Sequence, residues 1–161
     1  EVWCHASFFR LFDDAFARYP PSYTFYCHTA RYLWELEKAG ACEQFAEAER
    51  QKFGAGGEGD ALYTRIAWSM SVNCHNRFSC SSISWETMAA GFTRLIAEYP
   101  DSRWLKNAYA WFAFKAGDRM RLRPALAAVV DNPDMGIWVN LENVGFATKF
   151  AEESAPTAPP P

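Results

Sequence analysis

The fold is decided by residues 92–118, which read FTRLIAEYPDSRWLKNAYAWFAFKAGD. Apolar residues recur at three- and four-residue spacing on both sides of Tyr99-Pro100, and this spacing is the period of amphipathic helices. Ser102 has a side-chain oxygen that can cap the second helix, and Gly117 can adopt the left-handed conformation that ends it. The stretch therefore predicts two helices joined at a proline corner.

An earlier segment repeats this pattern. Residues 12–30 align with residues 92–110 without gaps, and a three-residue adjustment then brings Ala39-Gly40 onto Ala116-Gly117. Self-similarity of this kind is typical of stacked helical units that bury their apolar faces against their neighbours. The matched residues are Phe12 with Phe92, Ala17 with Ala97, Tyr19-Pro20 with Tyr99-Pro100, Ser22 with Ser102, and Ala30 with Ala110.

The rest of the chain also predicts helices. Residues 54–59 contain four glycines, which predicts a flexible connector rather than a helix. Pro124 either kinks a helix that begins at Asp118 or occupies the first position of one that begins near Arg123. The other expected helices cover residues 8–19, 22–39, 42–53, 62–73, 84–99, 102–116 and 135–150, with a polar loop at 74–82.

The length and composition predict one domain. Half of the 161 residues are apolar, which is enough to bury a core, and we expect a single helical-repeat domain over residues 1–153. The proline-rich residues 154–161 predict a disordered tail or a linker. Because the chain starts at Glu1 without a leader, we expect a processed chain or an excised domain.

The junctions carry a resemblance to a known family. Tyr99-Pro100-Asp101-Ser102, then Ala110, then Gly117-Asp118 resemble the tetratricopeptide pattern, and the chain is similar to uncharacterised bacterial tetratricopeptide-like proteins. The resemblance implies an all-α, irregular right-handed stack of about seven or eight antiparallel helices. The stack is expected to be irregular because the two copies lie 80 residues apart, whereas the family repeats every ~34 residues.

The resemblance also implies a partner-binding surface. In such stacks the first helix of each hairpin lines a concave face, where tryptophan supplies apolar anchor area and polar side chains hold a protein or peptide. The alternative is that Trp104 and Trp111, the tryptophans of the later copy, belong to the core. The residues that the resemblance places on the face are Trp104, Asn107, Trp111 and Lys115 in the later copy, and Thr24, Cys27, Arg31 and Trp34 in the earlier one.

Charge and hydropathy exclude two kinds of partner. A formal charge of −3 lacks the global attraction that nucleic-acid binders use. Charged residues interrupt every candidate span of ~20 apolar residues, so no membrane insertion is expected. A local basic stretch could meet an acidic peptide or a phosphate, but we favour a solvated helix end. Its residues are Lys115, Arg119, Arg121 and Arg123.

The three histidines each follow a cysteine, as Cys4-His5, Cys27-His28 and Cys74-His75. Only the loop from Cys74 to Cys80 suggests a local metal cluster or a disulfide, and its spacing differs from that of structural zinc sites. We favour ordinary thiols, with no metal, cofactor or catalytic residue. The alternative function is a metal-binding or thiol-dependent enzyme or regulator. An odd total of five cysteines favours a reducing, cytoplasmic compartment.

Overall fold

The computed structural model describes residues 14, 18, 23–35, 40–70, 78 and 81–153. These residues form helices, turns and connectors with no strand among them, which confirms the all-α class. Residue contacts divide the chain into two compact units, Glu1–Arg94 and Leu95–Pro161, and each is described by itself. Of the predicted helix 8–19 only residues 14 and 18 are described, and both are helical. The tail 154–161 lies outside the described residues, and the single-domain boundary at 153 stays a prediction.

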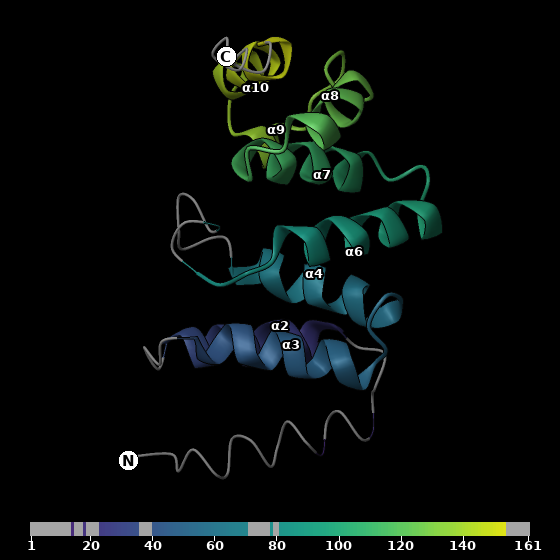
Figure 1. The fold of residues 1–161 in the computed structure, drawn as a ribbon, viewed down its shortest axis with the longest axis vertical. Helices are drawn as coiled ribbons and strands as arrows, with labels where there is room; N and C mark the ends of the chain where they lie inside the picture. Colours follow the sequence, from purple (N-terminus) through teal and green to yellow (C-terminus); the bar gives the residue numbers. More distant parts are fainter. Residues whose placement is uncertain are drawn as a thin grey trace, which may run out of the picture. The chain divides into compact units, whose positions relative to one another are not determined.

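Unit 1 contains α2 (Tyr23–Glu35), α3 (Ala41–Lys52), α4 (Glu58–Met70) and α6 (Trp85–Glu98), whose last turn crosses the unit boundary. Helices α2, α3 and α4 pack against one another in all three pairs (Figure 1). Small and large apolar side chains share the core, since Ala30, Ala46 and Ile66 are all fully buried. This mixture of sizes lets the helices approach closely while the larger side chains fill the remaining space.

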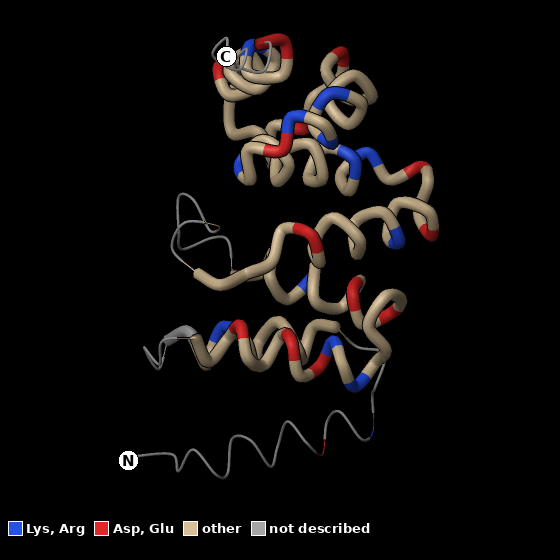
Figure 2. The backbone as a smooth tube through the Cα atoms, in the orientation of Figure 1, with Lys and Arg blue, Asp and Glu red and all other residues tan. Residues whose placement is uncertain are grey.

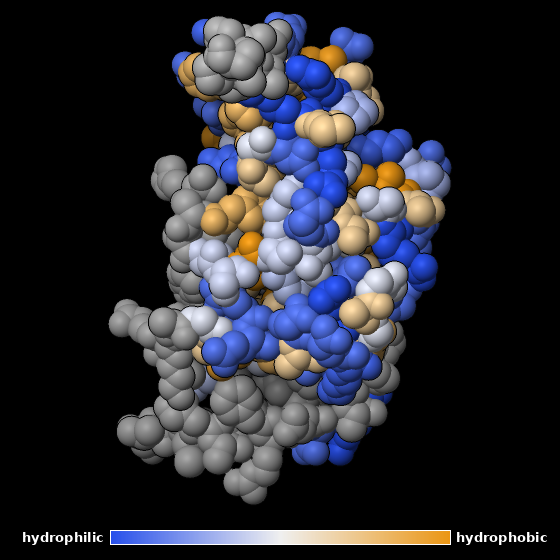
Figure 3. Space-filling model, viewed as in Figure 1, coloured by the Kyte–Doolittle hydropathy of each residue, from blue (hydrophilic) through white to orange (hydrophobic). Residues whose placement is uncertain are grey.

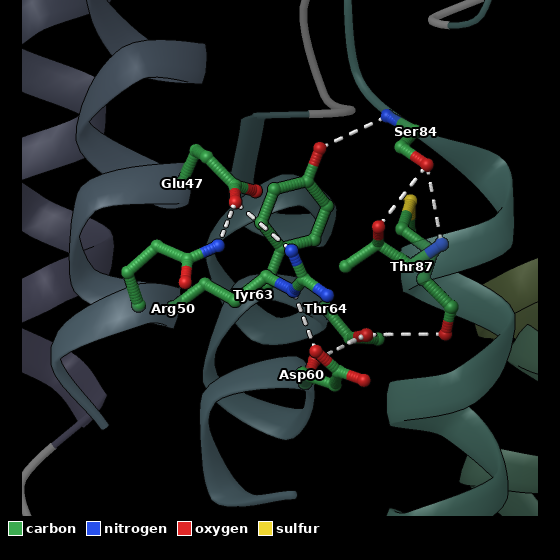
Figure 4. Close-up of polar contacts among 9 residues, drawn as sticks. Glu47, Arg50, Asp60, Tyr63, Thr64, Ser84 and Thr87 are labelled. Carbon is green, nitrogen blue, oxygen red and sulfur yellow. Dashed lines mark hydrogen bonds and ion pairs between the residues drawn. The ribbon is translucent and has the colours of Figure 1, made fainter. Parts of the chain in front are cut away.

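Polar contacts join α3, α4 and α6 inside unit 1 (Figure 4). The Arg50 guanidinium donates to the buried Asp60 carboxylate at 2.6 Å, and this hydrogen bond raises the pKa of Arg50. The Tyr63 hydroxyl accepts from the Ser84 backbone amide at 2.9 Å. The Thr64 hydroxyl lies 3.1 Å from the Met88 carbonyl oxygen and donates to it. These contacts satisfy buried polar groups, so we assign them to the scaffold.

Two glycines in unit 1 lie where backbones nearly touch. A Cβ atom added to Gly91 in α6 would lie 2.1 Å from both the Asp60 carbonyl oxygen and the Thr64 hydroxyl of α4. One added to Gly59 would lie 2.1 Å from the Arg50 carbonyl oxygen of α3. The prediction of no helix across 54–59 is therefore wrong at its end, because α4 begins at Glu58 and needs Gly59 for this approach.

Unit 2 contains α7 (Arg103–Lys115), α8 (Arg119–Ala127), α9 (Met135–Trp138) and α10 (Leu141–Glu152). The predicted caps are confirmed: the Ser102 hydroxyl accepts from the Leu105 amide, and the Asp118 carboxylate accepts from the Arg121 amide. Pro124 lies inside α8, so the helix begins after Asp118 and not near Arg123. Helix α8 packs against both α7 and α10.

The predicted single helix over residues 135–150 is wrong. Val139 adopts φ 68°, which ends α9, and the Asn140 side chain then caps α10 by accepting from the Asn143 amide at 2.9 Å. A β-branched residue at positive φ is strained, so other contacts must hold the bend. The Asn143 side-chain amide supplies one such contact by donating to the Trp138 carbonyl oxygen at 2.8 Å.

The two aligned copies have matching helices. Residues 23–30 of α2 and 103–110 of α7, which the gap-free alignment pairs, are helical in both copies. Gly40 and Gly117, the paired turn glycines, have φ angles of 76° and 73°. Both predicted left-handed turns are confirmed, and in each unit the next helix, α3 or α8, folds back to pack against the first.

Substituting Gly91 by alanine is expected to destabilise unit 1 by about 1–3 kcal/mol, because the new methyl group cannot fit against α4. The control is Gly145→Ala in α10, where an added Cβ meets no atom within 4 Å. That change should be neutral or stabilise its helix by up to about 1 kcal/mol. Urea unfolding followed by circular dichroism measures both, and equal effects would contradict the close approach.

Candidate functional site

The predicted partner-binding residues of the later copy lie along α7. Trp104, Trp111 and Lys115 follow one line of this helix, since seven- and four-residue steps nearly complete whole turns. Trp104 is 49% exposed, and Trp111 and Lys115 are half-buried. The Lys115 ammonium lies 5.1 Å from the centre of the Trp111 ring, within the range of a cation–π interaction. The line is therefore exposed at Trp104 and half-buried at Trp111 and Lys115.

Asn107 was predicted to contact a partner and is instead fully buried. Its side-chain oxygen accepts from the Trp138 indole at 2.8 Å and from the Asp134 backbone amide at 3.0 Å. Its amide nitrogen donates to the Arg103 carbonyl oxygen at 2.9 Å. Because the side chain is enclosed and its oxygen and nitrogen both have partners within unit 2, Asn107 holds α9 against α7 and does not face a partner.

A series of ring contacts crosses the same unit. The Trp138 ring packs edge-on against Trp111 with centres 5.4 Å apart, Trp111 contacts Phe114 at 6.0 Å, and Phe114 contacts Phe150 at 5.8 Å. The Arg119 guanidinium lies 4.2 Å from the centre of the Phe150 ring. Trp138 is buried, whereas the other rings are half-buried. We call Trp111, Phe114 and Phe150, with Lys115 and Arg119 at the two ends, the aromatic strip.

The basic stretch does not simply solvate a helix end. Figure 2 shows its lysine and arginine positions on α7 and α8. Arg119 donates to the Phe150 carbonyl oxygen at 3.0 Å, and Arg123 donates to the Ala151 carbonyl oxygen at 2.6 Å. The last carbonyls of a helix have no partner within it and carry partial negative charge. Two arginines of α8 thus cap α10, which corrects the expectation of a purely solvated stretch.

Helices α8 and α10 also border an open hollow of about 350 Å³. Its floor is apolar, with Leu126 and Ala151 buried and Val130 partly exposed. Arg123 and Glu152 lie at its edge and carry opposite charges. The hollow adds apolar surface to unit 2 without concentrating one charge.

The earlier copy places its predicted residues in unit 1. On α2, Arg31 and Thr24 are exposed and Cys27 is half-buried. The side chain of Trp34 lies outside what the structure describes. Trp104, Trp111 and Lys115 of the later copy therefore lie on one helix of unit 2. The predicted partner-binding residues of the earlier copy belong to unit 1.

The two described cysteines each lie against a backbone carbonyl oxygen. Cys42 is buried and donates to the Ala30 carbonyl oxygen at 2.8 Å, while Cys27 lies 3.6 Å from the Arg65 carbonyl oxygen. Burial raises the pKa of Cys27, which opposes formation of a nucleophilic thiolate. Within the described part of the chain, no three His, Cys, Asp or Glu residues could hold a metal ion. Cys4, His5, Cys74, His75 and Cys80 lie outside it, so the predictions of a metal cluster or a disulfide in that loop stay predictions.

No family model, curated protein or solved structure matches the chain. The candidate site therefore depends on the geometry of this molecule. Across the described residues, none of the helices has the length and apolar character that a membrane span requires.

The sequence pattern did not identify three of the aromatic residues in this series of ring contacts, namely Phe114, Trp138 and Phe150. Phe114 stands three residues after Trp111 on α7, and this spacing was a signal that the two rings are neighbours. Phe150 and Trp138 come from α10 and α9, and nothing in the local spacing of the sequence shows that they reach α7.

Replacing Asn107 by alanine is expected to destabilise unit 2 by about 2–4 kcal/mol, because the buried Trp138 indole and the Asp134 amide lose their acceptor. Near-ultraviolet circular dichroism should also show a loosened tryptophan environment. The control is Asn132→Ala, since Asn132 accepts from Arg103 at the surface and should contribute less than about 0.5 kcal/mol. A similar loss of stability in both variants would refute the assignment of Asn107.

Cys27 is expected to react with iodoacetamide only at a pH above that at which an unstructured peptide thiol reacts. Its pKa is raised, chiefly by burial, so less thiolate is present at any given pH. Mass spectrometry of the Cys27 peptide after labelling at a series of pH values gives the rate. Rapid labelling at neutral pH would revive a thiol-dependent activity for this residue.

Proposed function

We propose that this chain is a protein-interaction domain of tetratricopeptide-like type. The aligned helical residues 23–30 and 103–110 and the paired left-handed glycines Gly40 and Gly117 support a repeated helical hairpin. The binding surface is the line of α7 that begins at the exposed Trp104, and the partner is a protein or peptide. A right-handed arrangement of the hairpins belongs to the same proposal.

Unit 2 carries most of the large apolar side chains that are exposed among the described residues. Of the nine large apolar side chains exposed among the described residues, eight belong to unit 2. In the part of Figure 3 that holds α7 to α10, apolar residues reach the surface between hydrophilic ones. A partner that buries such side chains gains binding energy in proportion to the apolar area that it covers. The eight are Tyr99, Trp104, Met120, Val130, Met135, Val139, Leu141 and Phe146.

The exposed tryptophan of α7 carries the proposal. Trp104 is 49% exposed at the start of α7, and Trp111 and Lys115 continue the same line. Tryptophan is enriched among the residues that dominate binding energy, because its large rigid ring buries much area at low entropic cost. A partner that covers this line would gain one accessible anchor and a positive charge at its end.

Trp104→Ala is expected to lower recovery of co-purified proteins at least fivefold, which corresponds to about 1 kcal/mol or more for a central anchor. The matched control is Tyr23→Ala, since Tyr23 is 50% exposed on unit 1. Quantitative mass spectrometry after capture from the native host compares the two variants with the original chain. Equal recovery by all three proteins, each shown to be folded, would contradict the proposed surface.

A further inference from the structure

We infer that the aromatic strip binds a peptide segment in which carboxylates flank an apolar side chain. The inference rests on the proposed function and names the chemistry of its partner. The strip joins two cations through three half-buried rings, from Lys115 over Trp111 at one end to Arg119 over Phe150 at the other. Its charge and its apolar surface therefore point to a ligand that has both features.

The lysine at one end is available to an incoming carboxylate. Lys115 is half-buried, and its ammonium group lies over the Trp111 ring; none of the carboxylates that the structure describes pairs with it. A cation that lies over an aromatic ring keeps its charge, so its solvent-facing side can still form an ion pair with an anion. The other end of the strip shows which anion suits it.

A carboxylate of the chain itself already occupies the arginine end. The Arg119 guanidinium donates to the Glu153 carboxylate at 2.9 Å, while its Nε donates to the Phe150 carbonyl oxygen. Glu153 is 52% exposed, so this ion pair is solvent-screened and exchangeable. The contact with Glu153 therefore indicates that Arg119 pairs with a carboxylate. The same contact means that Glu153 competes with any partner for Arg119.

The rings make a peptide a better ligand than a free anion. Trp111, Phe114 and Phe150 present half-buried faces and edges whose further burial would add binding energy in proportion to area. A small free anion would meet only the cations at the two ends and would leave these rings uncovered. A segment with a few carboxylates around one apolar residue satisfies both conditions.

The test uses a fluorescein-labelled peptide in which one tryptophan is flanked by glutamates, and a second peptide with glutamines in their place. Fluorescence anisotropy measures the affinity of each peptide for the full chain. We expect the glutamate peptide to bind at least about threefold more tightly, and its affinity to fall as salt rises from about 50 to 300 mM. Equal affinities for the two peptides would overturn the inference.

Variants of both ends of the strip sharpen the test. Lys115→Ala should weaken binding of the glutamate peptide about threefold, as expected for one exposed ion pair. Its control is Lys106→Ala, the same change of charge about half a turn around α7. Glu153→Gln should strengthen binding about twofold, because the internal competitor for Arg119 is removed. A Lys115 effect no larger than the Lys106 effect, or weaker binding by Glu153→Gln, would contradict the inference.

The result separates this inference from the proposed function. Suppose that Trp104→Ala lowers recovery of the native partner but the two peptides bind equally well. The proposed interaction surface is then supported, and the inference of an acidic partner is wrong. Sedimentation analysis tests whether the aromatic strip instead binds a second copy of the chain. If the chain dimerises and Lys115→Ala disrupts the dimer, the strip contacts that second copy and the inference is wrong.

Discussion

The buried amide of Asn107 is the contact on which the candidate site depends. Its oxygen holds both the Trp138 indole and the backbone at the start of α9, and its nitrogen binds back to α7. A buried polar group must be satisfied, so the side chains around it can adopt few arrangements. Trp138 is thereby fixed against Trp111, and this contact sets the position from which the aromatic strip begins.

The strained bend after α9 follows from the same constraint. A continuous helix would satisfy the local pattern of residues 135–150, but Trp138 must reach Asn107 in the interior. Val139 adopts a positive φ as a result, and Asn140 and Asn143 stabilise the restart of the helix. The cost of one unfavourable backbone conformation is offset by burial of a whole indole ring.

Unit 1 relies on a different constraint, the close approach of helices at Gly59 and Gly91. The absence of a side chain at these positions lets α4 contact α3 and α6 backbone to backbone. The Arg50–Asp60 ion pair and the Thr64 hydroxyl then satisfy the polar groups that the approach buries. Such close packing requires small residues at the crossings, which is consistent with the buried alanines of α2 and α3.

The sequence by itself determined the class of the fold and most of its local signals. The caps Ser102 and Asp118 and the turn glycines Gly40 and Gly117 act within a few residues, so their roles follow from local chemistry. Three predictions were wrong. They were a single helix across Val139, a partner-facing Asn107 and a basic stretch at Arg119 that only solvates a helix end. In each case a contact distant in the chain outweighed a local preference, because burial and hydrogen bonding between helices contribute more free energy than helix propensity. Only the tertiary structure decided which side chains meet, and therefore where the aromatic strip lies.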